Sequence, residues 1–241
     1  AIHNAAFAAL GLDATYEAVR VPGGGFASIT SDLLAGQFVG INVTMPHKDD
    51  AYVAVDDRDP LATLSRAVNT IVVSEGRLHG HNTDVAGVVH AVDLLGLADD
   101  CPVVVLGYGG AARAAVVAMS ERTVYVCGRD EHRAAALAEA TDGSIDTLAW
   151  GSAIEGAIVI NATPLGMHGE SLPEAVARHA AGIIDMTYGS KPTPAIDRAA
   201  AAGIPHADGI DMLTGQAYRA FELFTGLPAP RDVMALAARS R

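Results

Sequence analysis

Three short polar segments in the first third of the chain carry residue types suited to acid–base chemistry. They read Asn-Val-Thr-Met-Pro-His-Lys at 42–48, Ala-Val-Asn-Thr at 67–70 and Gly-His-Asn-Thr-Asp at 80–84. A lysine and a carboxylate form a workable proton-transfer pair, because the carboxylate orients the ammonium and burial brings the pKa of a lysine towards neutrality. When each residue is considered separately, the simpler interpretation is that Lys48 is a surface cation and Asp84 caps a helix. The local sequence does not bring the two together.

Each of these segments flanks a predicted strand, and polar groups that converge at strand ends form small ligand sites in α/β proteins. A helix is expected to follow the third segment because Asn82-Thr83 precedes it as a cap and Gly96 ends it. The elements expected in this half are strands at Thr15–Val21 and Val39–Thr44, a helix at Phe26–Leu34, a hairpin of Val68–Ser74 and Arg77–Gly80 around Glu75-Gly76, and a helix at Asp84–Leu95.

The rest of the chain alternates short apolar runs with longer helical patterns, which predicts strand–helix units around a mostly parallel sheet. The expected strands are Val103–Leu106, Thr123–Cys127, Ala157–Asn161, Gly182–Met186 and Ile204–His206. The expected helices are Ala111–Met119, Glu131–Thr141, Leu172–His179, Thr193–Ala202, Met212–Thr225 and Arg231–Ala238. The change of pattern near residues 84–86 marks a domain boundary.

A glycine-rich turn follows the apolar strand Val103–Leu106 and reads Gly107-Tyr108-Gly109-Gly110-Ala111-Ala112. In the G-x-G-x-x-A spacing the first glycine makes a tight turn, the second lets the backbone approach a pyrophosphate, and the small third residue packs helix on strand. The helix that begins there adds unpaired N–H groups and the positive end of its dipole. The strand and helix context supports a dinucleotide site over a simple turn.

The next strand ends in Cys127-Gly128-Arg129-Asp130, where such sites distinguish the two adenosine riboses. Arg129, with Arg133 one helical turn further, suits a 2′-phosphate and favours NADP. Asp130 keeps NAD open, since it could neutralise Arg129 or bind a ribose hydroxyl. The alternative is that these are surface charges and Asp130 only caps the helix.

The composition narrows the function classes. The 241 residues carry a net charge of −12 with a pI near 5.0, which argues against a broad nucleic-acid or anionic-membrane surface. Two cysteines without ligand spacing favour a reducing, cytoplasmic setting. The apolar runs are too short to span a bilayer. His79, His81 and His90 lack a metal-binding spacing, so no metal site is expected.

The three polar segments and the glycine turn resemble the shikimate dehydrogenase family, and the likeness runs through the whole chain. Further matches in the same order are Asn161–Met167, Asp185–Tyr188 with Thr193-Pro194, and Gly209–Leu213 followed by Gln216. The resemblance implies a discontinuous α/β substrate domain, residues 1–85 and 209–241, with an inserted Rossmann-type NADP-binding domain, residues 86–208. It implies reversible NADPH-dependent reduction of 3-dehydroshikimate to shikimate, a step of aromatic amino-acid biosynthesis.

The resemblance also implies a role for particular residues. Lys48 and Asp84 would be the catalytic pair and would also touch the substrate, with Lys48 exchanging the proton at the reacting oxygen. The other substrate-binding residues would be Thr44, Asn69, Tyr188 and Gln216. The cofactor-binding residues would be Gly107, Tyr108, Gly109, Gly110, Ala111, Arg129, Asp130, Arg133, Thr163, Met186 and Gly209, with Met212 beside the nicotinamide.

The sequence departs from the family in two places. The family carries a strand and a Ser-x-Ser motif upstream of the His-Asn segment, and a chain without them is expected to lack one strand of the substrate sheet. Gly128-Arg129-Asp130 stands where the family more often has Asn-Arg-Thr, which weakens the cofactor assignment. Two alternatives therefore stand beside the leading hypothesis: an NAD-dependent quinate or shikimate dehydrogenase, and a dinucleotide-binding protein without activity. Oligomeric state is not readable from the sequence.

Overall fold

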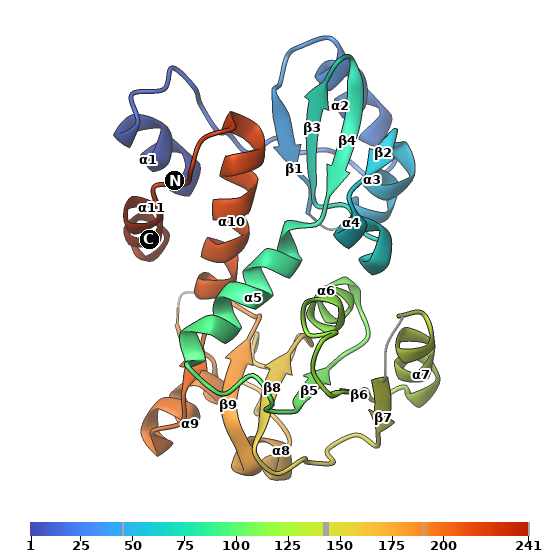
Figure 1. Cartoon of the computed structure of the whole chain (residues 1–241), viewed down its shortest axis with the longest axis vertical. Helices are drawn as coiled ribbons and strands as arrows, with labels where there is room; N and C mark the ends of the chain where they lie inside the picture. Colours follow the sequence, from blue (N-terminus) through green and yellow to red (C-terminus); the bar gives the residue numbers. More distant parts are fainter. Residues whose placement is uncertain (45, 142–144, 190, 241) are drawn as a thin grey trace. The chain divides into compact units, whose positions relative to one another are not determined.

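The computed structural model describes residues 1–44, 46–141, 145–189 and 191–240, which divide into two compact units (Figure 1). The first unit comprises residues 1–86 and 216–241, and the second comprises residues 87–215. The chain passes between the units inside two helices, α5 (Thr83–Leu95) and α10 (Gly209–Thr225). The predicted α/β class is confirmed.

The second unit is built on a six-stranded parallel sheet in the order β10-β9-β8-β5-β6-β7. The strand order reverses between β5 and β8, which is the topological switch point where doubly wound sheets bind their ligands. The strands are β5 (Val103–Leu106), β6 (Val124–Cys127), β7 (Ile145–Leu148), β8 (Ala157–Asn161), β9 (Ala180–Asp185) and β10 (His206–Ala207).

Both faces of this sheet are covered, which is why its central strands are apolar at nearly every position and fully buried. Residues of α5, α6 (Gly110–Ala118), α7 (Glu131–Glu139) and the start of α10 pack into one core cluster. Residues of α8 (Glu174–His179) and α9 (Pro194–Ala202) pack into the other.

The first unit contains a four-stranded sheet in the order β1-β3-β4-β2, with β1 (Gly40–Asn42), β2 (Asp57–Arg58), β3 (Thr70–Ser74) and β4 (Arg77–His81). The predicted hairpin is confirmed: β3 and β4 pair antiparallel through Glu75 and Gly76, whose φ angles of 52° and 72° fit the primed turn that matches strand twist. The helices α2 (Phe26–Leu34), α3 (Lys48–Ala54) and α4 (Pro60–Ser65) accompany the sheet. Helix α1 (Ile2–Ala9) contacts α11 (Arg231–Arg239).

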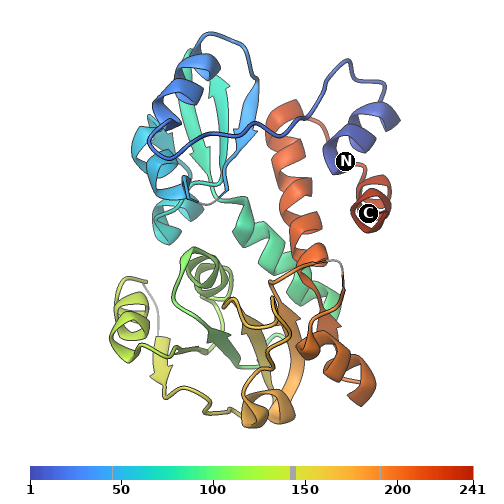
Figure 2. The ribbon, with the colours of Figure 1, turned by 180° about the vertical axis from the view of Figure 1, so that it is seen from behind.

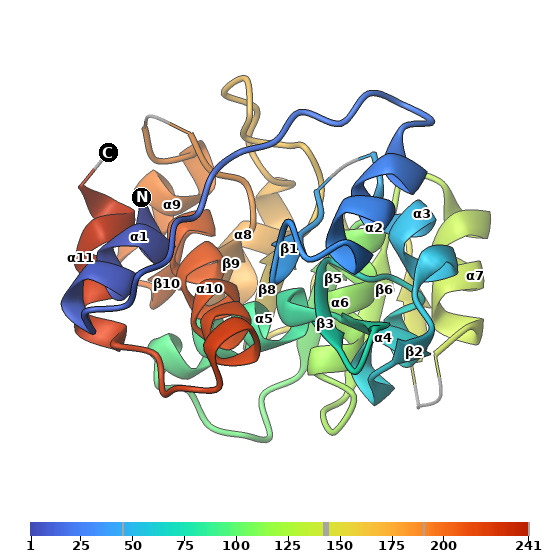
Figure 3. The ribbon, with the colours of Figure 1, turned by 90° about the horizontal axis from the view of Figure 1, so that it is seen from above.

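The strand expected at Thr15–Val21 is wrong. This segment is an extended chain without a strand, and it runs from α1 towards α2 (Figures 2 and 3). A cavity of about 550 Å³ is lined by this segment together with β1 and α2. A β-strand exists only through hydrogen bonds to a neighbour, and among the described strands β1, the edge of the sheet, pairs with β3 alone. Among the described strands none pairs with residues 15–21, so the alternating residues form no ladder.

The other expected elements are present with their ends shifted by a few residues. The sequence reading missed α1, α3 and α4 and the short strands β2 and β7. Helix α4 carries a signal that could have revealed it, because the Asp59 side chain accepts from the Ala62 N–H at 2.6 Å and Pro60 fills the first helical position.

Candidate active site

Lys48 and Asp84 meet in the first unit. The Lys48 ammonium donates to Asp84 Oδ2 across 2.5 Å, although the two residues are 36 positions apart. The Asp84 side chain is 8% exposed and the Lys48 side chain 25%, so the carboxylate is buried while the ammonium remains accessible. A buried ion pair with an open ammonium can hand a proton to a bound oxygen and keep its geometry.

Local structure fixes both partners. Lys48 is the first residue of α3, which begins shortly after β1. Asp84 lies in the first turn of α5, where the Asn82 side chain accepts from the Asp84 N–H at 3.0 Å. A carboxylate in the first turn of a helix faces the positive end of the helix dipole, which is a favourable position for a negative charge.

Asn69 orders the carboxylate from the other side. Its Nδ2 donates to Asp84 Oδ1 at 2.8 Å, so the two Asp84 oxygens have different partners. Its Oδ1 accepts from the Thr83 N–H at 2.8 Å and from the hydroxyls of Thr83 and Thr70 at 3.1 Å. Asn69 is 4% exposed, and the carboxamide is locked in one orientation.

The remaining predicted substrate residues are divided between the two units. Gln216 belongs to the first unit, and its Oε1 lies 3.5 Å from Asn69 Nδ2. Thr44 is exposed shortly after β1 in the same unit. Tyr188 lies in the second unit, 54% exposed in the segment after β9.

The glycine turn lies at the switch point of the second unit, directly after β5. Gly107 has a φ of +118°, and a Cβ there would lie 2.9 Å from the Ala162 carbonyl oxygen, so only glycine fits. Around Gly109 the space within 4 Å is open, and Gly109 is the N-cap residue of α6, which has no side-chain cap hydrogen bond. An uncapped helix N-terminus beside open space is the kind of position at which backbone N–H groups bind an anion.

The three predicted cofactor residues after β6 have different surroundings. Asp130 is the N-cap of α7, and its Oδ1 accepts from the Arg133 N–H at 3.1 Å. The Arg133 guanidinium lies over the Tyr108 ring, 4.4 Å from its centroid. Arg129 is exposed immediately after Gly128.

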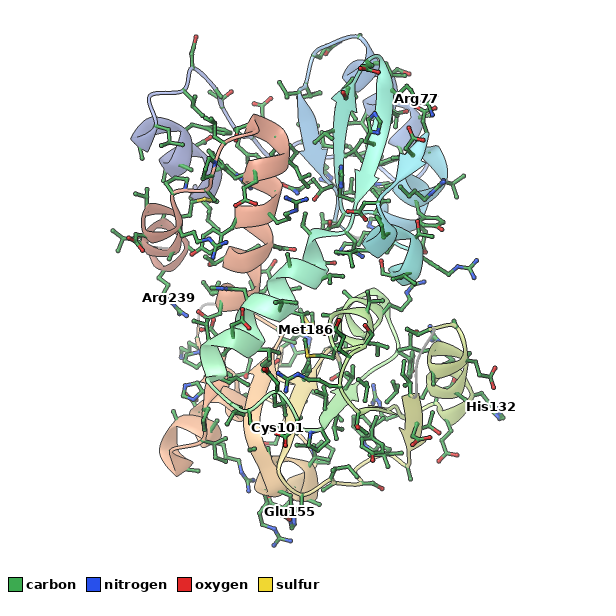
Figure 4. All side chains as sticks on the ribbon, in the orientation of Figure 1. Arg77, Cys101, His132, Glu155, Met186 and Arg239 are labelled. Carbon is green, nitrogen blue, oxygen red and sulfur yellow. The ribbon has the colours of Figure 1, made fainter. Side chains whose placement is uncertain are left out.

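Two more predicted cofactor residues, Thr163 and Met186, lie beside a buried hydrogen-bond network that was not predicted from the sequence. Asp185, at the end of β9, is fully buried and accepts from Asn161 Nδ2 at 2.9 Å and from the Thr193 hydroxyl at 2.6 Å. Asn161 Oδ1 in turn accepts from the backbone and hydroxyl of Thr163. Met186 follows Asp185 and is labelled in Figure 4. The sequence signal was a carboxylate that ends an otherwise apolar strand.

Gly209 and Met212 are both buried at the start of α10. A Cβ on Gly209 would lie 2.6 Å from the Thr187 carbonyl oxygen, so this glycine allows the close approach of two backbone segments. Met212 belongs to the hydrophobic core of the second unit.

The histidines have ordinary partners. His81 Nδ1 lies 3.0 Å from Asp59, and His47 lies 3.0 Å from both Asp50 and the Val21 carbonyl. The hydrogen bond to Asp50 raises the pKa of His47 above its usual value. Within the described ranges no three His, Cys, Asp or Glu side chains group as a metal site. Nor does any helix of those ranges combine the length and apolar character needed to cross a bilayer.

A parallel sheet with a glycine turn at its switch point, and a separate unit with a lysine–aspartate pair, define the class of two-domain dinucleotide-dependent dehydrogenases. Comparison with known proteins narrows the class. A family model for the shikimate dehydrogenase substrate binding domain matches residues 1–71, and one for the shikimate 5'-dehydrogenase C-terminal domain matches residues 209–239. A curated protein of Citrifermentans bemidjiense, named shikimate dehydrogenase (NADP(+)), is 39% identical over 99% of this chain and 89% of its own length.

Solved structures agree. Shikimate 5-dehydrogenase from Thermus thermophilus, in complex with NADP(H) and shikimate, has a TM-score of 0.90 and 34% identity, covering 99% of this chain and 92% of that one. Shikimate 5-dehydrogenase from Listeria monocytogenes, in complex with shikimate and NAD, has a TM-score of 0.86 and 28% identity, covering 98% and 90%. The chain belongs to the shikimate dehydrogenase family.

Proposed function

We propose that this chain catalyses the reversible reduction of 3-dehydroshikimate to shikimate with NADPH. The observation that carries the proposal is the contact between Lys48 and Asp84, formed in a chain 39% identical to a named shikimate dehydrogenase. The substrate is a small molecule. Two free cysteines support a reducing, cytoplasmic setting.

We assign residues 1–85 and 209–241 to the substrate and residues 86–208 to the cofactor. Residues 209–215 are an exception within this assignment, because they cluster with the second unit, and Gly209 would contact the cofactor. The uncapped start of α6 and the open space beside Gly109 fit a dinucleotide. Gly107, Tyr108, Gly109, Gly110 and Ala111 would hold its pyrophosphate. Thr163 and Met186 would flank the nicotinamide, and the bound cofactor supplies the hydride.

The chain's own residues manage the proton. As the carbonyl oxygen of the substrate gains negative charge, the Lys48 ammonium donates a proton to it, and in the reverse direction the neutral amine takes the proton back. Asp84 orients the ammonium and balances its charge, and Asn69 keeps Asp84 from rotating. Thr44, Gln216 and Tyr188 would bind the hydroxyls and ring of the substrate.

Steady-state oxidation of shikimate tests the proposal. Turnover should be fastest with shikimate and NADP⁺, and slower with NAD⁺ or with quinate as substrate. A preference for quinate and NAD⁺ would favour the related dehydrogenase instead. No turnover with either substrate and either cofactor would leave a dinucleotide-binding protein without activity.

A substitution tests the role of Lys48. Lys48→Ala should lower kcat by about 10²- to 10⁴-fold, the usual contribution of a general acid or base. Its affinity for NADP⁺ should stay close to wild type, because Lys48 belongs to the first unit and the glycine turn to the second. Arg77→Ala, which removes an exposed cation of the same unit, is the matched control and should keep full activity (Figure 4). Turnover that survived Lys48→Ala would show that another group transfers the proton.

A further inference from the structure

The aromatic ring of Tyr108 occupies the space beside Gly128 at the carboxyl end of β6. A Cβ on Gly128 would lie 2.6 Å from Tyr108 Cδ1 and 3.1 Å from Cε1, closer than such atoms approach one another. Gly128 has no positive φ, so its backbone would accept any residue. A side chain at position 128 would have to displace the Tyr108 ring, which occupies the space beside Gly128.

The same ring carries a cation. The Arg133 guanidinium lies 4.4 Å from the centroid of the Tyr108 ring, within the range of a cation–π interaction. Arg133 is exposed in the first turn of α7. An exposed arginine samples many rotamers, so a ring beneath its guanidinium removes part of the entropy that ligand binding would otherwise cost.

Asp130 has a task of its own at this strand end. One of its carboxylate oxygens accepts the backbone N–H of Arg133, which makes Asp130 the N-cap of α7. In dinucleotide-binding sheets, the residues after the second strand meet the adenosine ribose. Here the side chains at that position are Arg129 and Arg133, and a guanidinium pairs with a phosphate through two parallel hydrogen bonds.

We propose that Tyr108 is a specificity-determining residue for the 2′-phosphate of the adenosine ribose, because it fills the place of a side chain at position 128 and holds the Arg133 guanidinium there. The proposal deepens the proposed function, since it rests on the cofactor being bound by the second unit. It also explains why this chain has glycine at position 128, where the family more often has asparagine. The Tyr108 ring occupies the space that a side chain at this position would need.

Binding measured without turnover tests this proposal. Isothermal titration of the full chain with adenosine 2′,5′-bisphosphate and with adenosine 5′-monophosphate separates the 2′-phosphate from the rest of the nucleotide. Tyr108→Leu should weaken binding of the bisphosphate about two- to fivefold more than it weakens binding of the monophosphate, the size of an exposed cation–π interaction. Tyr108→Phe retains the ring and should bind both as wild type does. Gly128→Ala should imitate Tyr108→Leu, because the new Cβ displaces the ring.

A double-substitution cycle distinguishes this role from a purely structural one. Arg133→Ala should weaken the bisphosphate more than Tyr108→Leu does, and in the Arg133→Ala background Tyr108→Leu should cause no further loss. Equal weakening of both nucleotides by Tyr108→Leu, or no change at all, would overturn the proposal. So would a wild-type chain that binds the two nucleotides equally. A chain that shows the expected binding but does not oxidise shikimate would disprove the proposed reaction alone.

Discussion

Replacing Asp185 by asparagine should destabilise the second unit by about 2 kcal/mol, although the substitution changes almost no volume. The Asp185 carboxylate is fully buried at the end of β9 and accepts four hydrogen bonds. They come from Asn161 Nδ2, from the N–H and hydroxyl of Thr187, and from the Thr193 hydroxyl. These donors belong to the end of β8 and to the segment that follows β9, so one carboxylate orders both.

The expected loss of stability follows from replacing a charged hydrogen-bond acceptor by a neutral one. A hydrogen bond to a charged group contributes about 1.5–3 kcal/mol and a neutral one about 0.5–1.5 kcal/mol, so neutralisation weakens each bond by about 1 kcal/mol. The amide can turn its NH₂ towards Thr193, whose hydroxyl then accepts, and the cost of burying a charge disappears. This gain offsets part of the roughly 4 kcal/mol of weakened bonds and leaves about 2 kcal/mol.

The sole tryptophan of the chain provides the assay. Trp150 packs against the second core cluster of this unit, so its fluorescence during urea denaturation reports the unfolding of this sheet. Thr193→Val, which removes only the 2.6 Å bond, is the matched control and should cost about 1–2 kcal/mol. An Asp185→Asn variant as stable as wild type would refute the view that the charge of this carboxylate orders the two segments.

Two further predictions concern the first unit. Burial lowers the pKa of His3 from 6.5 to about 4. The unfolded chain therefore gains a proton below pH 6.5 that the folded chain refuses until about pH 4, and stability should fall by about 2 kcal/mol between neutral pH and pH 5. Urea denaturation of His3→Phe followed by circular dichroism should show this loss reduced; an unchanged pH dependence would assign it to other groups. Gly40→Ala should cost about 1–3 kcal/mol, because its Cβ would lie 2.7 Å from both the Ile71 carbonyl and the Phe224 ring. Gly23→Ala, in open space, is its control, and equal stability of the two variants would contradict the packing argument.

The sequence predicted the second unit better than the first for a physical reason. Strands such as Val103–Leu106 and Ala157–Asn161 are buried on both faces, so their apolar runs are unmistakable in the chain itself. The first unit is made of short strands and helices whose patterns resemble loops. The segment Thr15–Val21 alternates as a strand should, yet forms none, because pairing is not a property of the segment.

The two parts of the candidate site also differ in how well the sequence predicted them. The glycine turn could be read from the sequence because each of its residues does its work within a few positions of its neighbours, as the open space at Gly109 and the tight turn at Gly107 demonstrate. The resemblance to the family identified Lys48 and Asp84 as a catalytic pair. Without that resemblance, the sequence around each residue favoured a surface cation at Lys48 and a helix cap at Asp84.

By itself, the sequence determined the α/β class, the dinucleotide turn and the residue types available for proton transfer, since these depend on local periodicity and short-range spacing. Only the tertiary structure brought Lys48 to Asp84 across 36 positions, placed Gln216 3.5 Å from Asn69, and laid Arg133 over Tyr108. Those contacts depend on which strands and helices become neighbours. That choice is made by the packing of whole elements, because no short segment contains the partner against which it will be buried.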